Sequence, residues 1–102
     1  PTNAEARVVS GQVYLLQGRF VEADESFRIA SETTDGDHSL FYAWGKTLSL
    51  LGLTELALEK YEKACELDPY DADVYDAWGN ALKALGRFAE AAEVYKRAAE
   101  YL

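Results

Sequence analysis

Cysteine and proline are scarce in this sequence of 102 residues. The single cysteine, Cys65, cannot form an internal disulfide, which favours a reducing compartment such as the cytoplasm. The only prolines are Pro1 and Pro69, whereas alanine is abundant. This composition favours an all-α fold over a β-sheet.

Basic residues are also few. Ten basic residues stand against eighteen acidic ones, which gives a net charge of −8. Nucleic acids and the anionic surfaces of membranes attract proteins of the opposite sign, because affinity comes from neutralising phosphates and acidic head groups. The composition therefore argues against both, and it favours a protein or peptide partner that is neutral or basic.

Long apolar runs are missing as well. No segment approaches the roughly 20 apolar residues of a membrane-spanning helix, and the first residues lack the basic and apolar regions of a signal peptide. Because the chain could be a fragment of a longer protein, this absence does not assign a location.

A period of 34 residues is the strongest positive signal in the sequence. Two glycine positions, two alanine positions and one aromatic position each occur three times at this spacing. The five sets are Gly11, Gly45 and Gly79; Gly18, Gly52 and Gly86; Ala23, Ala57 and Ala91; Phe27, Tyr61 and Tyr95; and Ala30, Ala64 and Ala98. Such a period indicates a helical-repeat fold. The repeats run at about 4–37, 38–71 and 72–102 within a single domain of residues 1–102.

Each repeat is predicted to contain two helices, because apolar residues recur at helical spacing on both sides of its second glycine. Gly52 lies just past the first helix of its repeat, where a residue with positive φ is favoured. Asp68 precedes Pro69, which disfavours the helical conformation in the residue before it and so ends the second helix. Asp37 and Asp71 stand where they can cap the helices that follow.

Small residues are expected where helices pack together. Gly45 and Ala57 are predicted to let the two backbones of a hairpin approach closely, while Trp44, Leu48 and Tyr61 fill the remaining space. Because one hairpin cannot bury its apolar faces alone, successive hairpins are expected to stack.

The third repeat carries a recognisable set of residues: Trp78-Gly79, Ala81-Leu82, Leu85-Gly86-Arg87-Phe88, Glu90-Ala91, Tyr95 and Ala98. Together with the 34-residue period, this set resembles the tetratricopeptide repeat, and the resemblance covers nearly the whole chain. It implies a right-handed superhelical stack of three antiparallel helical hairpins that acts as a protein–protein interaction module. The first repeat departs from the pattern, because Arg7 and Ser10 stand where the family prefers large apolar residues and Asp35-Gly36-Asp37 replaces the usual proline turn.

The resemblance also implies where a ligand binds. In the tetratricopeptide-repeat family the first helices line a concave groove for a peptide or a partner helix, and the second helices form the convex back. Among the first-helix residues that the repeat register assigns to this groove, ten form the candidate site: Val8, Gln12, Leu15, Tyr42, Lys46, Ser49, Asp73, Asp76, Asn80 and Lys83. The side formed by the first repeat is apolar and the side formed by the third carries two acids, a combination that suits a short peptide or a helix. We expect an adaptor or scaffold.

The groove residues also allow an interpretation without a peptide ligand. If its apolar residues pack on a neighbouring segment of a longer protein, the chain is a structural spacer or a self-associating segment without a discrete peptide ligand. Some family members bind acidic chaperone peptides through a clamp of Lys, Asn and Arg. The matching positions here hold Val8, Gln12, Ala43, Asp73 and Ala77. None of these is basic, so an acidic ligand is disfavoured.

No constellation of residues points to catalysis, a metal or a cofactor. Gly45-Lys46-Thr47 resembles the end of a phosphate-binding loop, but it falls within a predicted helix, where backbone N–H groups are already used. His38, the only histidine, is expected in a surface loop near Asp35 and Asp37. Cys65 is expected to be a small packing residue, because no activating base is indicated beside it. We therefore expect a protein that is not an enzyme.

The final helix is expected to leave apolar surface open. The ends of helical-repeat stacks need a polar outer face, and in the resembled family an extra amphipathic helix often covers the last repeat. Beyond the residues needed for its own hairpin, the last helix offers Ala92, Val94, Ala99, Tyr101 and Leu102. This predicts weak homo-oligomerisation with a contact centred on residues 92–102.

Overall fold

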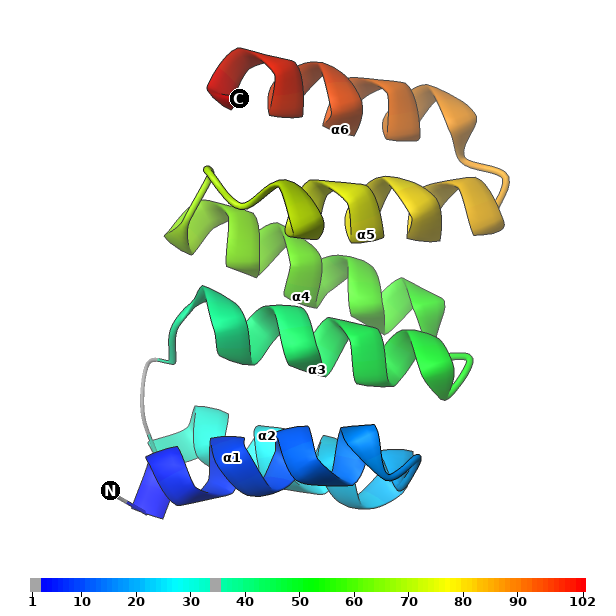
Figure 1. Cartoon of the computed structure of the whole chain (residues 1–102). Coiled ribbons are helices and arrows are strands. Elements are labelled where there is room, and N and C mark those ends of the chain that lie inside the picture. Colours follow the sequence, from blue (N-terminus) through cyan, green and yellow to red (C-terminus); the bar gives the residue numbers. More distant parts are fainter. Residues whose placement is uncertain (1–2, 34–35) are drawn as a thin grey trace.

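The computed structural model describes residues 3–33 and 36–102. In these segments the chain forms six α-helices and no strand, which confirms the all-α fold class (Figure 1). None of the described helices has both the length and the apolar character that crossing a membrane requires. The helices are α1 (Asn3–Leu16), α2 (Phe20–Thr33), α3 (His38–Leu50), α4 (Thr54–Leu67), α5 (Ala72–Ala84) and α6 (Phe88–Tyr101).

The helices pair into three hairpins that stack along the chain, from α1–α2 at one end to α5–α6 at the other (Figure 1). Between hairpins, α2 packs on α3 and α4 packs on α5. The first helices also meet directly, since α1 touches α3 and α3 touches α5, whereas no such contact joins the described parts of α2, α4 and α6. Successive second helices are therefore held further apart than successive first helices.

The predicted turn glycines adopt the conformation that the helix ends require. Gly18, Gly52 and Gly86 have φ angles of +76°, +81° and +75°. In the second hairpin, Gly52 N donates to Ser49 O at 3.0 Å and Leu53 N donates to Leu48 O at 2.8 Å. This pair of bonds satisfies carbonyls at the end of α3 and turns the chain into α4. The same pattern occurs after α1 and α5.

The predicted helix caps and the predicted stop are confirmed. The side chain of Asp37 accepts a hydrogen bond from Leu40 N, and that of Asp71 accepts one from Asp73 N, each at 3.0 Å. These bonds satisfy backbone donors that have no partner within their helix. Helix α4 ends at Leu67, just before the Asp68-Pro69 pair.

The helix glycines make room for aromatic rings rather than for the partner backbone, which corrects the expectation for Gly45. A Cβ atom at Gly45 would lie 2.5 Å from Cε1 of Tyr61, and one at Gly11 would lie 2.6 Å from Cε1 of Phe27. Gly79 has the same relationship to Tyr95. Ala57 is completely buried, as its predicted packing role requires. Each hairpin is thus closed by a ring from its second helix that fills a gap in its first.

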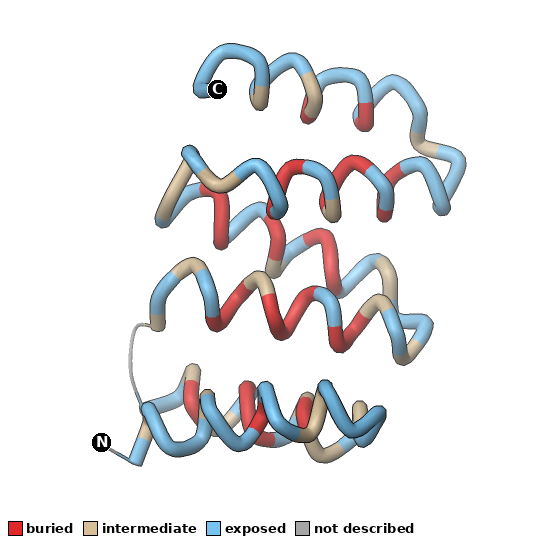
Figure 2. The backbone as a smooth tube through the Cα atoms, in the orientation of Figure 1, coloured by how far each residue is buried: buried red, intermediate tan, exposed pale blue. Residues whose placement is uncertain are grey.

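Burial is concentrated on α3, α4 and α5, and it is lowest at the two ends of the stack (Figure 2). On α1, Arg7 and Ser10 are exposed, although the residues 34 positions later, Phe41 and Trp44, are buried. These departures from the repeat pattern place two polar side chains at the open end of the stack, where the later repeats have buried aromatic rings.

The expectation for the last helix is wrong at one residue. Val94 is only 4% exposed. It shares a pocket with Leu58 and Trp78, and therefore faces the preceding hairpin instead of the open end. Ala92, Ala99, Tyr101 and Leu102 are exposed as expected. Phe88, which the sequence analysis did not assign to this surface, is 66% exposed.

Candidate functional site

The ten predicted groove residues all lie on first helices, and none of them is buried. The structure leaves six exposed: Gln12, Lys46, Asp73, Asp76, Asn80 and Lys83. The other four, Val8, Leu15, Tyr42 and Ser49, are half-buried. The three helices that carry these residues touch in the order α1, α3, α5. The predicted residues are therefore accessible along one continuous row of helices.

A pocket of about 380 Å³ lies between α1 and α3. It brings together four of the predicted residues, Gln12, Leu15, Tyr42 and Lys46. Leu16, Ser39 and Ala43 complete its lining. Its walls combine aliphatic and aromatic carbon with an amide and an ammonium group, which is the mixture that small-ligand and peptide pockets use for burial and orientation.

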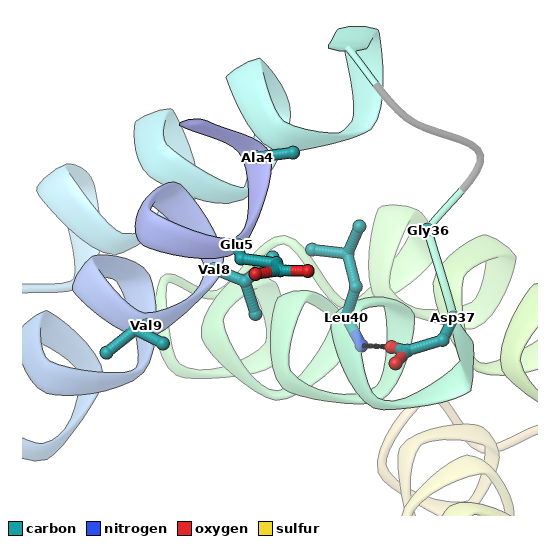
Figure 3. Close-up of a pocket in the computed structure, with 7 residues that line it drawn as sticks. All are labelled: Ala4, Glu5, Val8, Val9, Gly36, Asp37 and Leu40. Atoms are coloured by element: carbon teal, nitrogen blue, oxygen red, sulfur yellow. Dashed lines mark hydrogen bonds between the residues drawn. The ribbon is translucent and has the colours of Figure 1, made fainter. Parts of the chain in front are cut away.

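A larger cavity, of about 520 Å³, opens where α1 and α3 begin (Figure 3). Figure 3 shows Glu5 and Val8 pointing from α1 toward Leu40 at the start of α3. The carboxylate of Asp37 lies at the rim and accepts the hydrogen bond from Leu40 N. Of the ten candidate site residues, only Val8 lines this cavity. Leu40, which is almost completely buried, is not among the predicted site residues.

Tyr42 connects the α1–α3 pocket with the acidic residues of α5. Its ring centroid lies 6.3 Å from that of Tyr61, and Lys46 Nζ lies 5.2 Å from the Tyr42 centroid. Burial raises the pKa of Tyr42, and the negative charges of Asp73 and Asp76 raise it further. The side chain of Tyr42 therefore lies within the electrostatic field of the next hairpin.

Both acids on α5 are exposed, and neither forms an ion pair with a residue that the structure describes. They give the third-repeat side of the row a local negative charge that no neighbouring cation neutralises. Neither acid lines the pocket between α1 and α3. Tyr42 is therefore the residue through which the α1–α3 pocket and the acids of α5 influence each other.

Two predicted groove residues hold the hairpins together as well as facing outward. Ser49 Oγ lies 3.3 Å from the hydroxyl of Tyr61, and the hydroxyl of Tyr95 donates to Asn80 Oδ1 at 3.2 Å. Tyr61 and Tyr95 are two of the three rings that fill the gaps at the helix glycines. Lys83 Nζ also lies 5.6 Å from the centroid of Tyr95. Substitutions at Ser49, Asn80 or Lys83 will therefore affect packing as well as the outer surface.

The lone histidine has partners that the sequence did not predict. His38 begins α3 and is partly buried, with Nε2 3.3 Å from Asp71 Oδ2 and 3.6 Å from Asp68 Oδ2. Of its expected neighbours, Asp35 lies outside the described residues. Among the residues that are described, no cluster of three or more His, Cys, Asp or Glu side chains is arranged to hold a metal ion. The contact instead links the start of α3 to the junction between α4 and α5.

The remaining motifs have structural roles. Thr47 is buried within α3, where its hydroxyl donates to Ala43 O at 2.9 Å, so Gly45-Lys46-Thr47 is helix and not a phosphate-binding loop. Cys65 is buried, and burial raises the pKa of its thiol to about 11. A thiol with this pKa is almost entirely protonated at neutral pH, which is the inert form.

Comparisons with known proteins agree with this architecture. Residues 45–86 match a family model described as TPR repeat, and residues 72–101 match one described as tetratricopeptide repeat. The two matches together run over more than half of the chain. No curated protein sequence matches the chain at a significant level.

Solved structures with the same fold include MamA and YrrB. A MamA mutant superposes with a TM-score of 0.89 at 24% identity, covering 100% of this chain and 74% of its own. The crystal structure of MamA superposes with a TM-score of 0.90 at 24% identity, covering 96% and 57%. YrrB, described as a TPR protein with an unusual peptide-binding site, superposes with a TM-score of 0.87 at 28% identity, covering 96% and 50%. The chain thus spans between half and three quarters of the length of these proteins.

Proposed function

Because the chain belongs to the tetratricopeptide-repeat family, we propose that it is a protein-interaction module that binds a peptide or a partner helix along α1, α3 and α5. In this role it acts as an adaptor or scaffold, and no catalytic step is part of the proposal. We call the row of first helices, with the ten predicted residues on it, the groove.

The observation that carries this proposal is the pocket of about 380 Å³ between α1 and α3. It gathers Gln12, Leu15, Tyr42 and Lys46, which come from two different repeats, into one concave site. An aliphatic or aromatic side chain of a ligand can be buried against Leu15 and Tyr42, while Gln12 and Lys46 provide polar contacts at the edge. The peptide-binding site in the description of YrrB supports the same role for this chain by analogy of fold.

The charge of the groove favours a ligand that is neutral or basic where it crosses α5. Asp73 and Asp76 are exposed and unneutralised there, and the whole chain carries a net charge of −8. A basic ligand segment would approach an attractive field, whereas an acidic segment would meet repulsion.

The proposal can be tested by selecting binders from a displayed peptide library against the full chain. We expect Tyr42→Ala to weaken binding of the selected peptides about 5- to 30-fold, because truncating a central aromatic side chain typically costs 1–2 kcal/mol or more. Asn80→Ala should weaken binding as well. Val21→Ala, at an exposed position on α2, is the matched control and should leave affinity unchanged. Thermal unfolding should first show that the three variants are folded. If the selected peptides then bind Tyr42→Ala and Asn80→Ala as tightly as Val21→Ala, they do not bind in the groove.

A second candidate function is that of a structural or self-associating segment of a larger repeat protein. The observation in its favour is the apolar surface on the last hairpin, where Phe88 and Leu102 are 66% and 63% exposed. In this case the chain would space other parts of an assembly, and library selection against the groove would return no specific peptide.

A further inference from the structure

A third pocket, of about 260 Å³, lies between the second helices α4 and α6. Trp78 and Leu82 of α5 form its floor, and Leu58 of α4 and Val94 of α6 form its walls. No direct helix contact joins α4 to α6. The pocket therefore lies over α5, in the space between two second helices that do not touch each other. It is separate from the groove on the first helices.

The corresponding gap between α2 and α4 is filled by the chain itself. There the indole Nε1 of Trp44 donates to Asp24 Oδ1 at 2.8 Å, and Lys60 Nζ lies 3.9 Å from the centroid of the Trp44 ring. The residues 34 positions later than Asp24 and Lys60 are Leu58 and Val94. An acidic and a basic side chain in the first gap are thus replaced by two aliphatic side chains in the second.

This replacement leaves the indole of Trp78 without an acceptor. The side chain of Trp78 is only 7% exposed, and its Nε1 has no hydrogen-bond partner among residues 3–33 and 36–102. In the same segments, every fully buried side-chain nitrogen or oxygen has a partner, so Nε1 must reach solvent. An indole nitrogen can only donate, and such donors are normally paired when the ring is buried. Nε1 of Trp44 points at Asp24, and the residue equivalent to Asp24 in the next repeat is the pocket residue Leu58, so the repeat register directs Nε1 of Trp78 toward this pocket.

The charged groups around the pocket restrict what can accept this bond. The guanidinium of Arg97 lies 5.3 Å from the centroid of the Trp78 ring and has no carboxylate partner in the described chain. Glu62 and Glu93 also line the pocket, and neither is paired there. Arg87 is already engaged by glutamates on both sides.

An amide group can supply both an acceptor and a donor to these unpaired side chains. Its carbonyl oxygen can accept from Trp78 and Arg97, and its N–H can donate to Glu62 or Glu93. A carboxylate ligand would lie beside two unpaired carboxylates, and an ammonium ligand would leave the indole donor unused. We propose that the α4–α6 pocket is a second protein-binding site, which takes a segment of a partner through an amide group carried next to a branched aliphatic side chain.

Nuclear magnetic resonance of the full ¹⁵N-labelled chain tests this directly, because the sequence contains only two tryptophans and so gives two indole N–H signals. The probe is N-acetyl-leucine N-methylamide. We expect a saturable shift of the Trp78 signal with a Kd on the order of 1–10 mM, and no shift of the Trp44 signal, whose N–H is held by Asp24. No saturable shift of Trp78 at about 50 mM probe, several times that Kd, would overturn the proposal.

Three small ligands that share one carbon skeleton test whether the pocket prefers an amide, a carboxylate or an ammonium group. Isovaleramide, isovalerate and isopentylamine carry an amide, a carboxylate and an ammonium group on the same branched chain. The amide is expected to bind most tightly, and tighter binding of either charged analogue would contradict the assignment. The comparison of isovaleramide with N-acetyl-leucine N-methylamide then identifies whether a side-chain or a backbone amide is preferred.

Two variants locate the binding. Leu58→Asp supplies the carboxylate that Asp24 supplies in the first gap, so it should occupy the Trp78 donor and weaken probe binding about 2- to 10-fold, the effect of one hydrogen bond. Arg97→Gln removes an exposed charge without disturbing the core and should weaken binding by a similar factor. Lys63→Gln, 34 residues earlier, is the matched control. Equal probe affinity for Arg97→Gln, Lys63→Gln and the unmodified chain would place the probe elsewhere and reject the site.

Discussion

Gly45 on α3 and Tyr61 on α4 fit each other so closely that a Cβ atom at Gly45 would lie 2.5 Å from Cε1 of the tyrosine ring. Tyr61 is almost completely buried, and its hydroxyl lies 3.3 Å from Ser49 Oγ. The ring therefore has little freedom to move away. The same relationship joins Gly11 to Phe27 and Gly79 to Tyr95, so it is a repeated feature of the hairpins.

The first prediction is that Gly45→Ala destabilises the chain by about 1–3 kcal/mol, the usual cost of overpacking a core. The direction of the change in stability is informative, because Gly→Ala at an unhindered helical site stabilises a protein by about 0.4–1 kcal/mol. Urea denaturation followed by circular dichroism measures the change. In a Tyr61→Leu background, which removes the ring, Gly45→Ala should become neutral or stabilising. A higher denaturation midpoint for Gly45→Ala alone would show that the ring does not fill this space.

The second prediction concerns Cys65. This residue is 2% exposed, and its burial raises the pKa of the thiol to about 11. At pH 8 a disulfide reagent should react with this thiol only after the protein is unfolded by denaturant. The same rise in pKa determines how the stability of the native state changes with pH. The unfolded thiol ionises near pH 9 and the native thiol near pH 11, so the native state is progressively destabilised as pH rises through this window.

Cys65→Ala is the control for this titration. Between pH 9 and 11 the free energy of unfolding should fall less for Cys65→Ala than for the unmodified chain, because the variant has no thiol to ionise. Other groups that titrate in this window affect both proteins. Rapid reaction of native Cys65 at pH 8 would mean that the thiol is accessible or that its pKa is not raised.

Much of the fold could be predicted because the repeat period makes three segments equivalent. The turn at Gly52 and the caps at Asp37 and Asp71 depend on local chemistry, and each was correctly assigned from sequence. Contacts between repeats are different, because spacing along the chain does not specify which face of a helix meets its neighbour. For this reason Val94 was placed on the open end although it faces the preceding hairpin.

The candidate site was predictable to a smaller extent for the same reason. The register selects first-helix side chains that the structure leaves exposed or half-buried, but it does not indicate that the charges of Asp73 and Asp76 act on Tyr42. It also missed the contact of His38 with Asp68 and Asp71, since 30 or more residues separate these partners in the sequence.

The third prediction is that a groove ligand is neutral or basic beside α5 and that salt weakens its binding. Exposed charges are largely screened beyond about 10 Å at 0.1 M salt. Replacing Asp73 and Asp76 together by Asn should lower the affinity of a basic selected peptide and reduce the dependence of its Kd on salt. Glu66→Gln with Glu100→Gln, at exposed positions on α4 and α6, is the charge-matched control. A strongly acidic peptide that crosses α5 and binds well at physiological salt would contradict this prediction.

The fourth prediction is that the chain self-associates weakly through residues 92–102, where Tyr101 and Leu102 are exposed. Analytical ultracentrifugation over a range of concentrations should give a mass that rises with concentration. Tyr101→Glu should suppress the rise, whereas Val21→Glu on α2 should not. A strictly monomeric mass at high concentration, unchanged by Tyr101→Glu, would rule out this contact.

The central claim is that the groove on the first helices binds a peptide, and mapping a library-selected peptide by amide chemical shifts tests it most directly. The fifth prediction is that the largest saturable shifts fall on α1 and α3 around Gln12, Leu15, Tyr42 and Lys46, and extend to α5. Large shifts confined to α2, α4 and α6, with the signals of those four residues unchanged at saturation, would contradict the claim.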